Sequence, residues 1–406
     1  MVMQRTTLGV SGLAAAERFA IGPSSLSLFV FVQVLFYVLV QIPAGMLVDR
    51  WGSRVTGVLS CLVAGGGQLM LAVTTDLVPA VGARVLVGTG DALILMAVLA
   101  LIPRWFPGRL VITQLTVIVG QLGQILSAIP FLWVLHTRGW AVAFTSAAAL
   151  SVLAALLLWL SLRHRTPAVP PAGGSATSLR EMLAQVRVVW RRPGTKLGYC
   201  GHTAAQFSVM VFCLLWGYPY LVGVQAVAPA VASQMLSVLV VCSAVVAPAM
   251  GVVAARHPGL RMWLLACSAL ATMAVWTVLI VMPGPAPTWL LYVLIGVLSF
   301  GSPASVVALD IARTANPRAN VAVAQSLVNV GGFSATVIVL LSIGLILDWF
   351  GGFTLDAFRL AWLAQYPFWV FGLAGMVLYS RRARRAPDAP GPAQQPVRAG
   401  AAAGHG

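Results

Sequence analysis

The stretch Gly45-Met-Leu-Val-Asp49-Arg50-Trp-Gly52-Ser-Arg54 separates two long apolar segments at residues 25–48 and 55–74. A related stretch, Gly251-Val-Val-Ala-Ala255-Arg256-His-Pro-Gly259-Leu-Arg261, separates two more at residues 230–254 and 262–282. In both stretches an Arg follows the first Gly by five positions, and a trailing Gly and Arg recur with one extra residue in the second. Repeated halves of this kind are typical of membrane transporters. The repeat therefore predicts a chain built from two related halves.

The composition supports a membrane protein. The chain has 406 residues, of which 60% are hydrophobic and 8% charged, whereas a soluble domain carries about 25% charged residues. These proportions exclude a soluble enzyme and a disordered chain. Apolar segments about 20 residues long can cross a bilayer, and eleven are predicted, at residues 25–48, 55–74, 79–102, 110–135, 140–162, 197–222, 230–254, 262–282, 288–311, 321–347 and 358–379.

The first 24 residues contain a shorter apolar stretch, which we interpret as the outer half of a twelfth span. We expect that the start codon is annotated too late; loss of the inner half of this helix is the alternative. The predicted fold is therefore all-α, with two six-helix bundles. The predicted domains are residues 1–162, a cytoplasmic connector at 163–196, residues 197–380, and a disordered cytoplasmic tail at 381–406.

The net charge of +16 is explained by topology. Twenty of the 25 basic residues fall at one predicted face of the membrane, and loops rich in Lys and Arg lie in the cytoplasm. We therefore expect a multi-pass protein of the cytoplasmic membrane, in contact with anionic lipid. A nucleic acid is not an expected partner. The five Cys all lie in apolar segments and show no metal-ligand spacing.

The loop Gly45-x-Leu47-x-Asp49-Arg50-x-Gly52-x-Arg54 resembles the cytoplasmic signature of the major facilitator superfamily. The stretch Arg84-Val-Leu-Val-Gly88-Thr-Gly90-Asp91-Ala92 is similar to the helix 4 pattern of that family. The phrases Asp310-Ile-Ala-Arg313-Thr-Ala-Asn-Pro317 and Val328-Asn329-Val-Gly331-Gly332-Phe333 resemble a bacterial, actinobacterial subgroup. The resemblance implies alternating access around a central cavity. The helix 5 signature of proton-coupled drug exporters is absent, as is the pair of membrane arginines expected of nitrate carriers.

Ionisable residues inside apolar helices are the main candidates for a site. Arg84 and Asp91 lie seven residues apart and therefore project from one face of their helix. They could bind and release a proton or contact the substrate, because burial disfavours the charged form of the Asp91 carboxyl group and a nearby guanidinium favours it. The alternative is a static bond that locks two helices together. Arg5 could anchor an anion in the same cavity, unless it is a frayed terminal residue in the cytoplasm.

Uncharged polar residues at helical spacing predict a polar cavity wall or hydrogen bonds between helices. They are Gln33, Tyr37, Gln121, His202, Gln206, Gln325 and Asn329.

The signature loop itself predicts a cytoplasmic gate. It would be formed by Gly45, Asp49, Arg50, Gly52 and Arg54, with Asp49 facing the N-terminus of the span at 321–347, where the helix dipole favours negative charge. A determinant of membrane topology is the alternative.

These features predict a secondary transporter that moves a small solute and is coupled to protons through Asp91 and Arg84. A drug or metabolite efflux carrier of the same fold and a membrane sensor without transport remain as alternatives. A membrane enzyme is disfavoured, since no catalytic set shares one depth. We expect no cofactor, no metal and a monomer. Arg5 and Arg84 favour an anionic or carboxylate-bearing solute.

Overall fold

The computed structural model describes residues 1–105, 119–161, 179–317 and 320–385, and every regular element in these ranges is a helix. Eleven helical segments in the described ranges are long and apolar enough to cross a membrane. They coincide with the eleven spans predicted from hydropathy, within a few residues at most ends. The first part of the predicted span at 110–135 lies outside the described residues. The prediction of an all-α membrane fold is confirmed.

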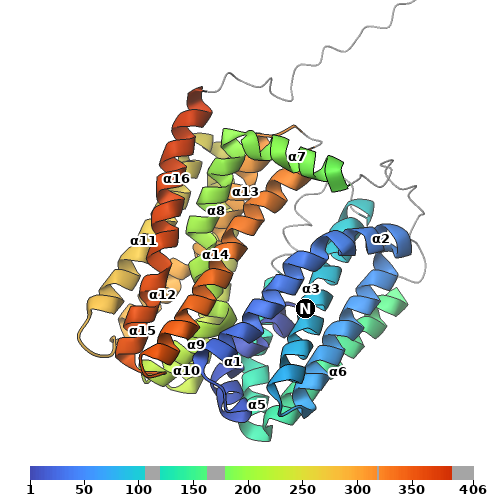
Figure 1. Ribbon diagram of the computed structural model, residues 1–406, viewed down its shortest axis with the longest axis vertical. Coiled ribbons are helices and arrows are strands. Elements are labelled where there is room, and N and C mark those ends of the chain that lie inside the picture. Colours follow the sequence, from blue (N-terminus) through green and yellow to red (C-terminus); the bar gives the residue numbers. More distant parts are fainter. Residues whose placement is uncertain (106–118, 162–178, 318–319, 386–406) are drawn as a thin grey trace, which may run out of the picture.

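The helices form two groups (Figure 1). The N-terminal group comprises α1 (Val2–Phe19), α2 (Pro23–Val73), α3 (Leu77–Trp105), the π-helical turn η1 (Ser127–Phe131), α5 (Leu132–Arg138) and α6 (Trp140–Ser161). The helix α2 contains two membrane spans. They are separated at Gly52, whose φ of 78° and ψ of 161° are not helical, in a region of backbone conformation that only glycine adopts readily.

The C-terminal group contains the remaining elements. They are α7 (Leu179–Arg191), α8 (Pro193–Val211), η2 (Phe212–Trp216), α9 (Gly217–Pro219), η3 (Tyr220–Val224), α10 (Pro229–Arg256), η4 (Pro258–Leu260), α11 (Arg261–Val281), α12 (Thr288–Leu298), α13 (Gly301–Thr314), α14 (Val321–Trp349), α15 (Leu355–Trp362), η6 (Leu363–Gln365) and α16 (Tyr366–Arg385).

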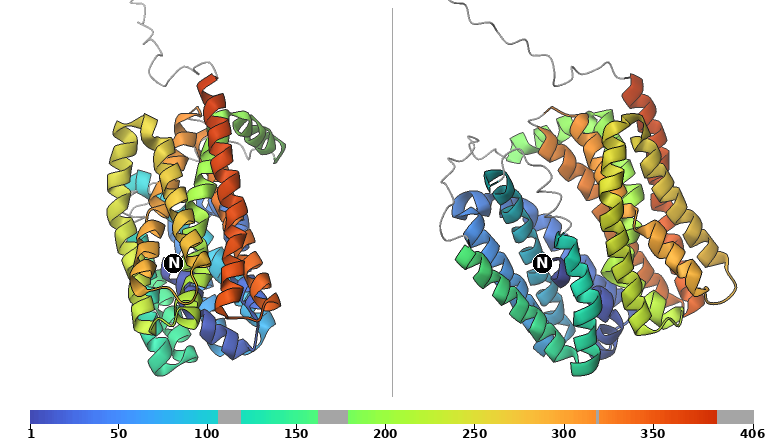
Figure 2. Two further views of the ribbon diagram at one scale, coloured as in Figure 1. Left: turned by 90° about the vertical axis from the view of Figure 1, so that its left-hand side faces the viewer. Right: turned by 180° about the vertical axis from the view of Figure 1, so that it is seen from behind.

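The connector helix α7 belongs with the C-terminal group. Gln185 Nε2 donates a hydrogen bond to Asn320 Oδ1 at 2.9 Å, and Arg192 Nη1 donates to the carbonyl oxygen of Ala315 at 3.1 Å. We call the end of the molecule where α7 lies the connector end, and the opposite end the far end. Figures 1 and 2 show that the two groups approach each other at the far end and diverge toward the connector end.

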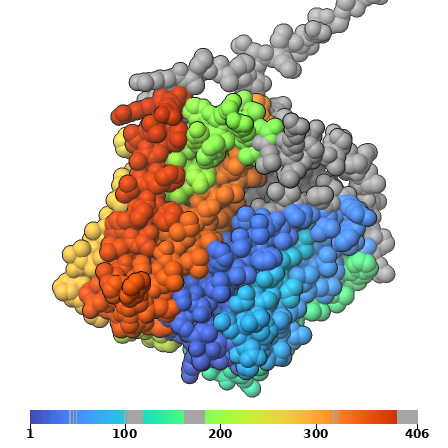
Figure 3. Space-filling model, in the orientation of Figure 1, coloured from blue at the N-terminus to red at the C-terminus, as the bar shows by residue number. Residues whose placement is uncertain are grey.

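Contacts between the groups are made mainly by α1, α2 and α14. The helix α1 packs against η2 and α9, and α2 packs along α14; the surfaces of α2 (blue) and α14 (orange) adjoin in Figure 3. Near the far end, Ser27 Oγ donates a hydrogen bond to the carbonyl oxygen of Leu340 at 2.9 Å. Deeper in the molecule, the rings of Tyr37 and Phe333 lie 5.6 Å apart.

Candidate functional site

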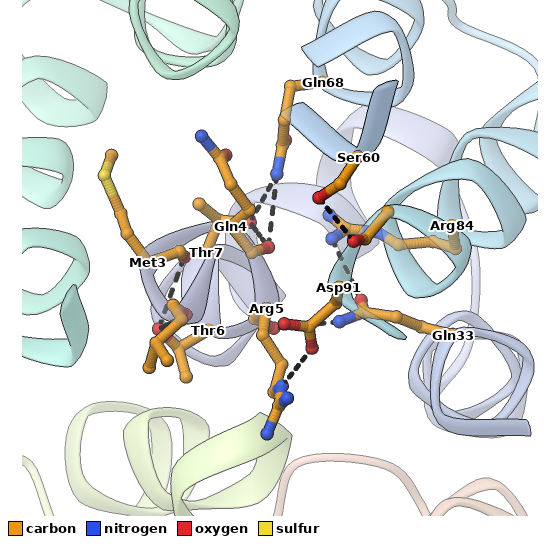
Figure 4. A network of polar contacts seen from close by, with 12 residues as sticks. Met3, Gln4, Arg5, Thr6, Thr7, Gln33, Ser60, Gln68, Arg84 and Asp91 are labelled. Atoms are coloured by element: carbon orange, nitrogen blue, oxygen red, sulfur yellow. Dashed lines mark hydrogen bonds and ion pairs between the residues drawn. The ribbon is translucent and has the colours of Figure 1, made fainter. Parts of the chain in front are cut away.

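An ion pair joins α1 to α3 inside the N-terminal group (Figure 4). Arg5 Nε lies 2.5 Å from Asp91 Oδ2, and the Arg5 guanidinium carbon lies 4.7 Å from the centroid of the Tyr37 ring on α2. The Asp91 side chain is 5% exposed and that of Arg5 is 21% exposed. The pair is therefore reachable through Arg5, while its carboxylate is almost enclosed.

The expected partnership of Asp91 with Arg84 is wrong in one respect: the cation that binds Asp91 is Arg5. Arg84 is fully buried, and its Nη1 donates a hydrogen bond to Gln33 Oε1 at 3.3 Å. A separation of seven residues corresponds to about 10.5 Å along a helix, so sharing a face does not bring the two groups into contact. Helix α1 instead places Arg5 against Asp91.

Gln33 connects the two arginines. Its Nε2 donates to the carbonyl oxygen of Arg5 at 3.3 Å, while its Oε1 accepts from Arg84. The Nε and Nη2 atoms of Arg84 have no hydrogen-bond partner among the described residues. Leaving a buried polar group unpaired costs free energy, so Arg84 is held in a high-energy environment next to the ion pair.

The backbones of α2 and α3 approach closely beside this cluster. A Cβ atom at Gly88 would overlap the carbonyl oxygen of Gln33, so only glycine fits there. This close approach allows the short Gln33 side chain to reach Arg84 on α3. The helix 4 pattern around Gly88 thus has a direct structural reason.

Sequence analysis missed a second polar network around α1 (Figure 4). Gln4 Nε2 donates to Ser151 Oγ at 2.7 Å, and Gln68 Nε2 donates to the carbonyl oxygen of Gln4 at 3.2 Å. Thr6 Oγ1 and Ser127 Oγ lie 2.7 Å apart. The available signal was the presence of Gln4 and Gln68 in otherwise apolar helices.

Two of the predicted polar residues of the C-terminal half form a separate cluster. His202 and Gln206 on α8 are buried, 1% and 8% exposed, and both face Gly332 of α14. Phe333 follows Gly332 and contacts Tyr37, which links this cluster to the ion pair of the N-terminal group.

The three other predicted polar residues, Gln121, Gln325 and Asn329, are partly exposed, and the structure joins none of them to the ion pair. Within the described ranges, His, Cys, Asp and Glu side chains form no group of three or more that could hold a metal.

The residues predicted as a gate lie at the connector end. Arg54 Nη2 donates to the carbonyl oxygen of Trp159 at 2.9 Å, and its guanidinium carbon lies 3.8 Å from the Trp159 ring centroid. Arg54 is thus held by α6 of its own group. Arg50 is exposed. Gly45 and Asp49 fall among positions whose side-chain environment lies outside the description, so the expected role of Asp49 stays a prediction.

The repeated loop of the C-terminal half is held differently. Arg261 Nη2 lies 3.0 Å from Asp310 Oδ2, and Arg313 Nη2 lies 2.5 Å from Asp310 Oδ1. Each loop arginine, Arg54 and Arg261, therefore anchors its loop within its own group.

Comparisons with known proteins agree on one family. The family model for the Major Facilitator Superfamily matches residues 1–224, more than half of the chain. A search of curated proteins found no match.

Solved structures show the same fold. A bacterial homolog of the human lysosomal transporter Spinster, in an inward-facing and unoccupied conformation, is 17% identical with a TM-score of 0.72 over 95% of each chain. The same homolog in an inward-facing and occupied conformation is 18% identical with a TM-score of 0.69 over 94% of each chain.

An aspartate-to-alanine mutant of the nucleoside transporter NupG is 15% identical, with a TM-score of 0.70 over 94% of this chain and 97% of that one. The protein is thus a multi-pass membrane protein. The chain belongs to the major facilitator superfamily of secondary transporters.

Proposed function

We propose that this protein is a proton-coupled carrier for a small carboxylate-bearing solute, and that the Arg5–Asp91 ion pair is the place where solute and proton compete. The observation that carries this proposal is the unequal exposure of the pair: Arg5 is 21% exposed and Asp91 5% exposed. An incoming carboxylate can therefore approach the guanidinium without first removing Asp91 from its enclosed position.

The chemistry is an exchange of partners. Arg5 binds the carboxylate of Asp91 in the absence of solute, and a guanidinium can bind two carboxylate oxygens at once. When the solute carboxylate takes this position, Asp91 loses its counterion in an apolar environment. Burial without a counterion disfavours the charged form of a carboxyl group, so Asp91 takes up a proton. Solute binding and proton binding are thereby linked.

The arrangement of the two helix groups supports alternating access. The groups contact each other at the far end and diverge toward the connector end. With the connector in the cytoplasm, as the positions of the basic residues predict, the contacts at the far end close the outer side of a carrier in the cytoplasmic membrane.

The test uses the purified full chain. A thermal-shift screen against mono- and dicarboxylates and cationic drugs identifies a stabilising solute, which is then followed in proteoliposomes with and without an imposed pH gradient. Asp91→Asn should abolish the accumulation driven by the gradient, since the amide cannot take up the proton. Asp356→Asn is the matched control, because this acid is 87% exposed and lies far from the pair; it should transport normally.

Two results would overturn the proposal. One is gradient-driven accumulation in Asp91→Asn equal to that of the unaltered protein. The other is stabilisation by cationic drugs alone, which would favour an efflux carrier and exclude an anion site at Arg5.

A further inference from the structure

A carboxylate of the C-terminal group caps a helix of the N-terminal group at the far end. Asp348, in the last turn of α14, accepts a hydrogen bond from the backbone N–H of Ser24 in the first turn of α2, with Ser24 N and Asp348 Oδ2 3.0 Å apart. The N-cap residue of α2 is Gly22, which has no side chain to cap the helix. The cap that α2 lacks in its own sequence is therefore supplied across the interface.

Gly22 also makes room for this contact. A Cβ atom at Gly22 would lie 2.5 Å from Asp348 Oδ1, which is closer than side-chain atoms pack. Any other residue at this position would push the carboxylate away from the helix terminus. The contact thus depends on a glycine at position 22, beside the donor, and on the carboxylate of Asp348 as the acceptor.

The charge of Asp348 is unfavourable within its own helix. The C-terminal end of a helix carries partial negative charge, and its N-terminal end carries partial positive charge. Asp348 lies at the negative end of α14 and at the positive end of α2. Its interaction with the helix dipoles is favourable only while the two ends touch, that is, while the far end is closed.

We propose that Asp348 is a positioning residue for transport: a far-end latch that favours the closed far end and sets the balance between the two conformations of the carrier. The proposal rests on the alternating access of the proposed function, but not on the solute or on proton coupling. Asp49 is predicted to make the same kind of contact at the opposite end of this helix pair, with the N-terminus of α14. The sequence therefore places an acid at the C-terminal end of α14 and another at the C-terminal end of the first membrane span of α2.

The effect of the latch on the conformational balance is modest. An interaction between a charge and a helix terminus changes an equilibrium about two- to fivefold. Asp348 is exposed, so Asp348→Asn should fold normally and shift the population by this factor toward the state with an open far end. Gly22→Ala keeps the charge but displaces it and should act in the same direction.

The measurement is a distance distribution between spin labels in lipid nanodiscs. Labels at the exposed positions Thr75 and Thr288 report on the far end, and labels at Val55 and Leu260 report on the connector end, after the exposed Cys267 is replaced by Ser. Longer far-end distances should gain population as longer connector-end distances lose it.

Two variants of Asp348 and one control complete the experiment. Asp348→Glu keeps the charge and should restore most of the closed population, whereas Asp356→Asn removes an exposed acid elsewhere and should change nothing. Unchanged distributions in both Asp348→Asn and Gly22→Ala would overturn the latch. A shift in a protein that accumulates no carboxylate would retain the latch and refute only the proposed solute.

Discussion

The Arg5–Asp91 ion pair allows a quantitative test of the site. Removing one partner of a buried pair costs about 3–5 kcal/mol, since the other charge is left uncompensated. Here Arg5 is 21% exposed, and water can partly replace its counterion, so we expect Arg5→Gln and Asp91→Asn each to lose about 1–3 kcal/mol of unfolding free energy. The double variant leaves neither member of the pair without its partner and should lose less than the sum.

The measurable quantity is the coupling energy of this double-mutant cycle. We expect about 1–3 kcal/mol, measured by unfolding in mixed micelles with an increasing fraction of denaturing detergent. The control cycle combines Arg359→Gln with Asp356→Asn, whose carboxylate is 87% exposed; it should give about 0.5 kcal/mol or less. If the two losses at Arg5 and Asp91 simply add, the pair has no energetic significance and the argument for competition at Arg5 fails.

Glycines beside the site and in the signature loop give two further predictions. Gly88→Ala should destabilise the protein by about 1–3 kcal/mol, since its methyl group meets the backbone of Gln33. The control Gly66→Ala meets nothing within 4 Å and should stabilise the protein by up to about 1 kcal/mol. Equal effects of the two substitutions in the same micelle assay would contradict the close packing of α2 and α3. The methyl group of Gly52→Ala has no atom within 4 Å either, but alanine is strained at a φ of 78° and should lower the unfolding free energy by about 1–3 kcal/mol. A neutral result would show that the break in α2 is not rigid.

The membrane spans could be predicted from the sequence because bilayer thickness sets their length. An apolar run of about 20 residues has few other stable environments, and the described parts of the eleven predicted segments coincide with helices of the structure. The first segment was harder to interpret, since it is short and carries Arg5. The structure shows it as α1, packed between the two groups rather than set apart from them.

The site could be predicted only in part. Arg5, Arg84 and Asp91 were identifiable because charges inside apolar helices are rare and costly. Their pairing depends on how α1 is rotated against α3, which hydropathy does not encode. Gln33 was identifiable as a polar residue in an apolar helix, but its bridging role requires the close approach at Gly88.

The far-end contact was missed for a different reason. Asp348 lies at the end of an apolar span, where an acid is usual and carries no signal of its own. Its partner is a backbone N–H of Ser24, and no sequence pattern marks a backbone donor. Only the antiparallel packing of α14 on α2 brings them together.

The charges inside the N-terminal group have an electrical consequence. Arg5 and Arg84 contribute two positive charges near a single carboxylate, Asp91, which leaves a surplus of one positive charge on these side chains. A monovalent carboxylate bound at Arg5 adds one negative charge, and the proton that Asp91 takes up in exchange removes one, so the surplus stays at one positive charge. A voltage of 100 mV acts on one charge crossing the membrane with about 2.3 kcal/mol. Because the surplus is equal in the two states, the resting potential of a cell would act alike on the empty and the loaded carrier.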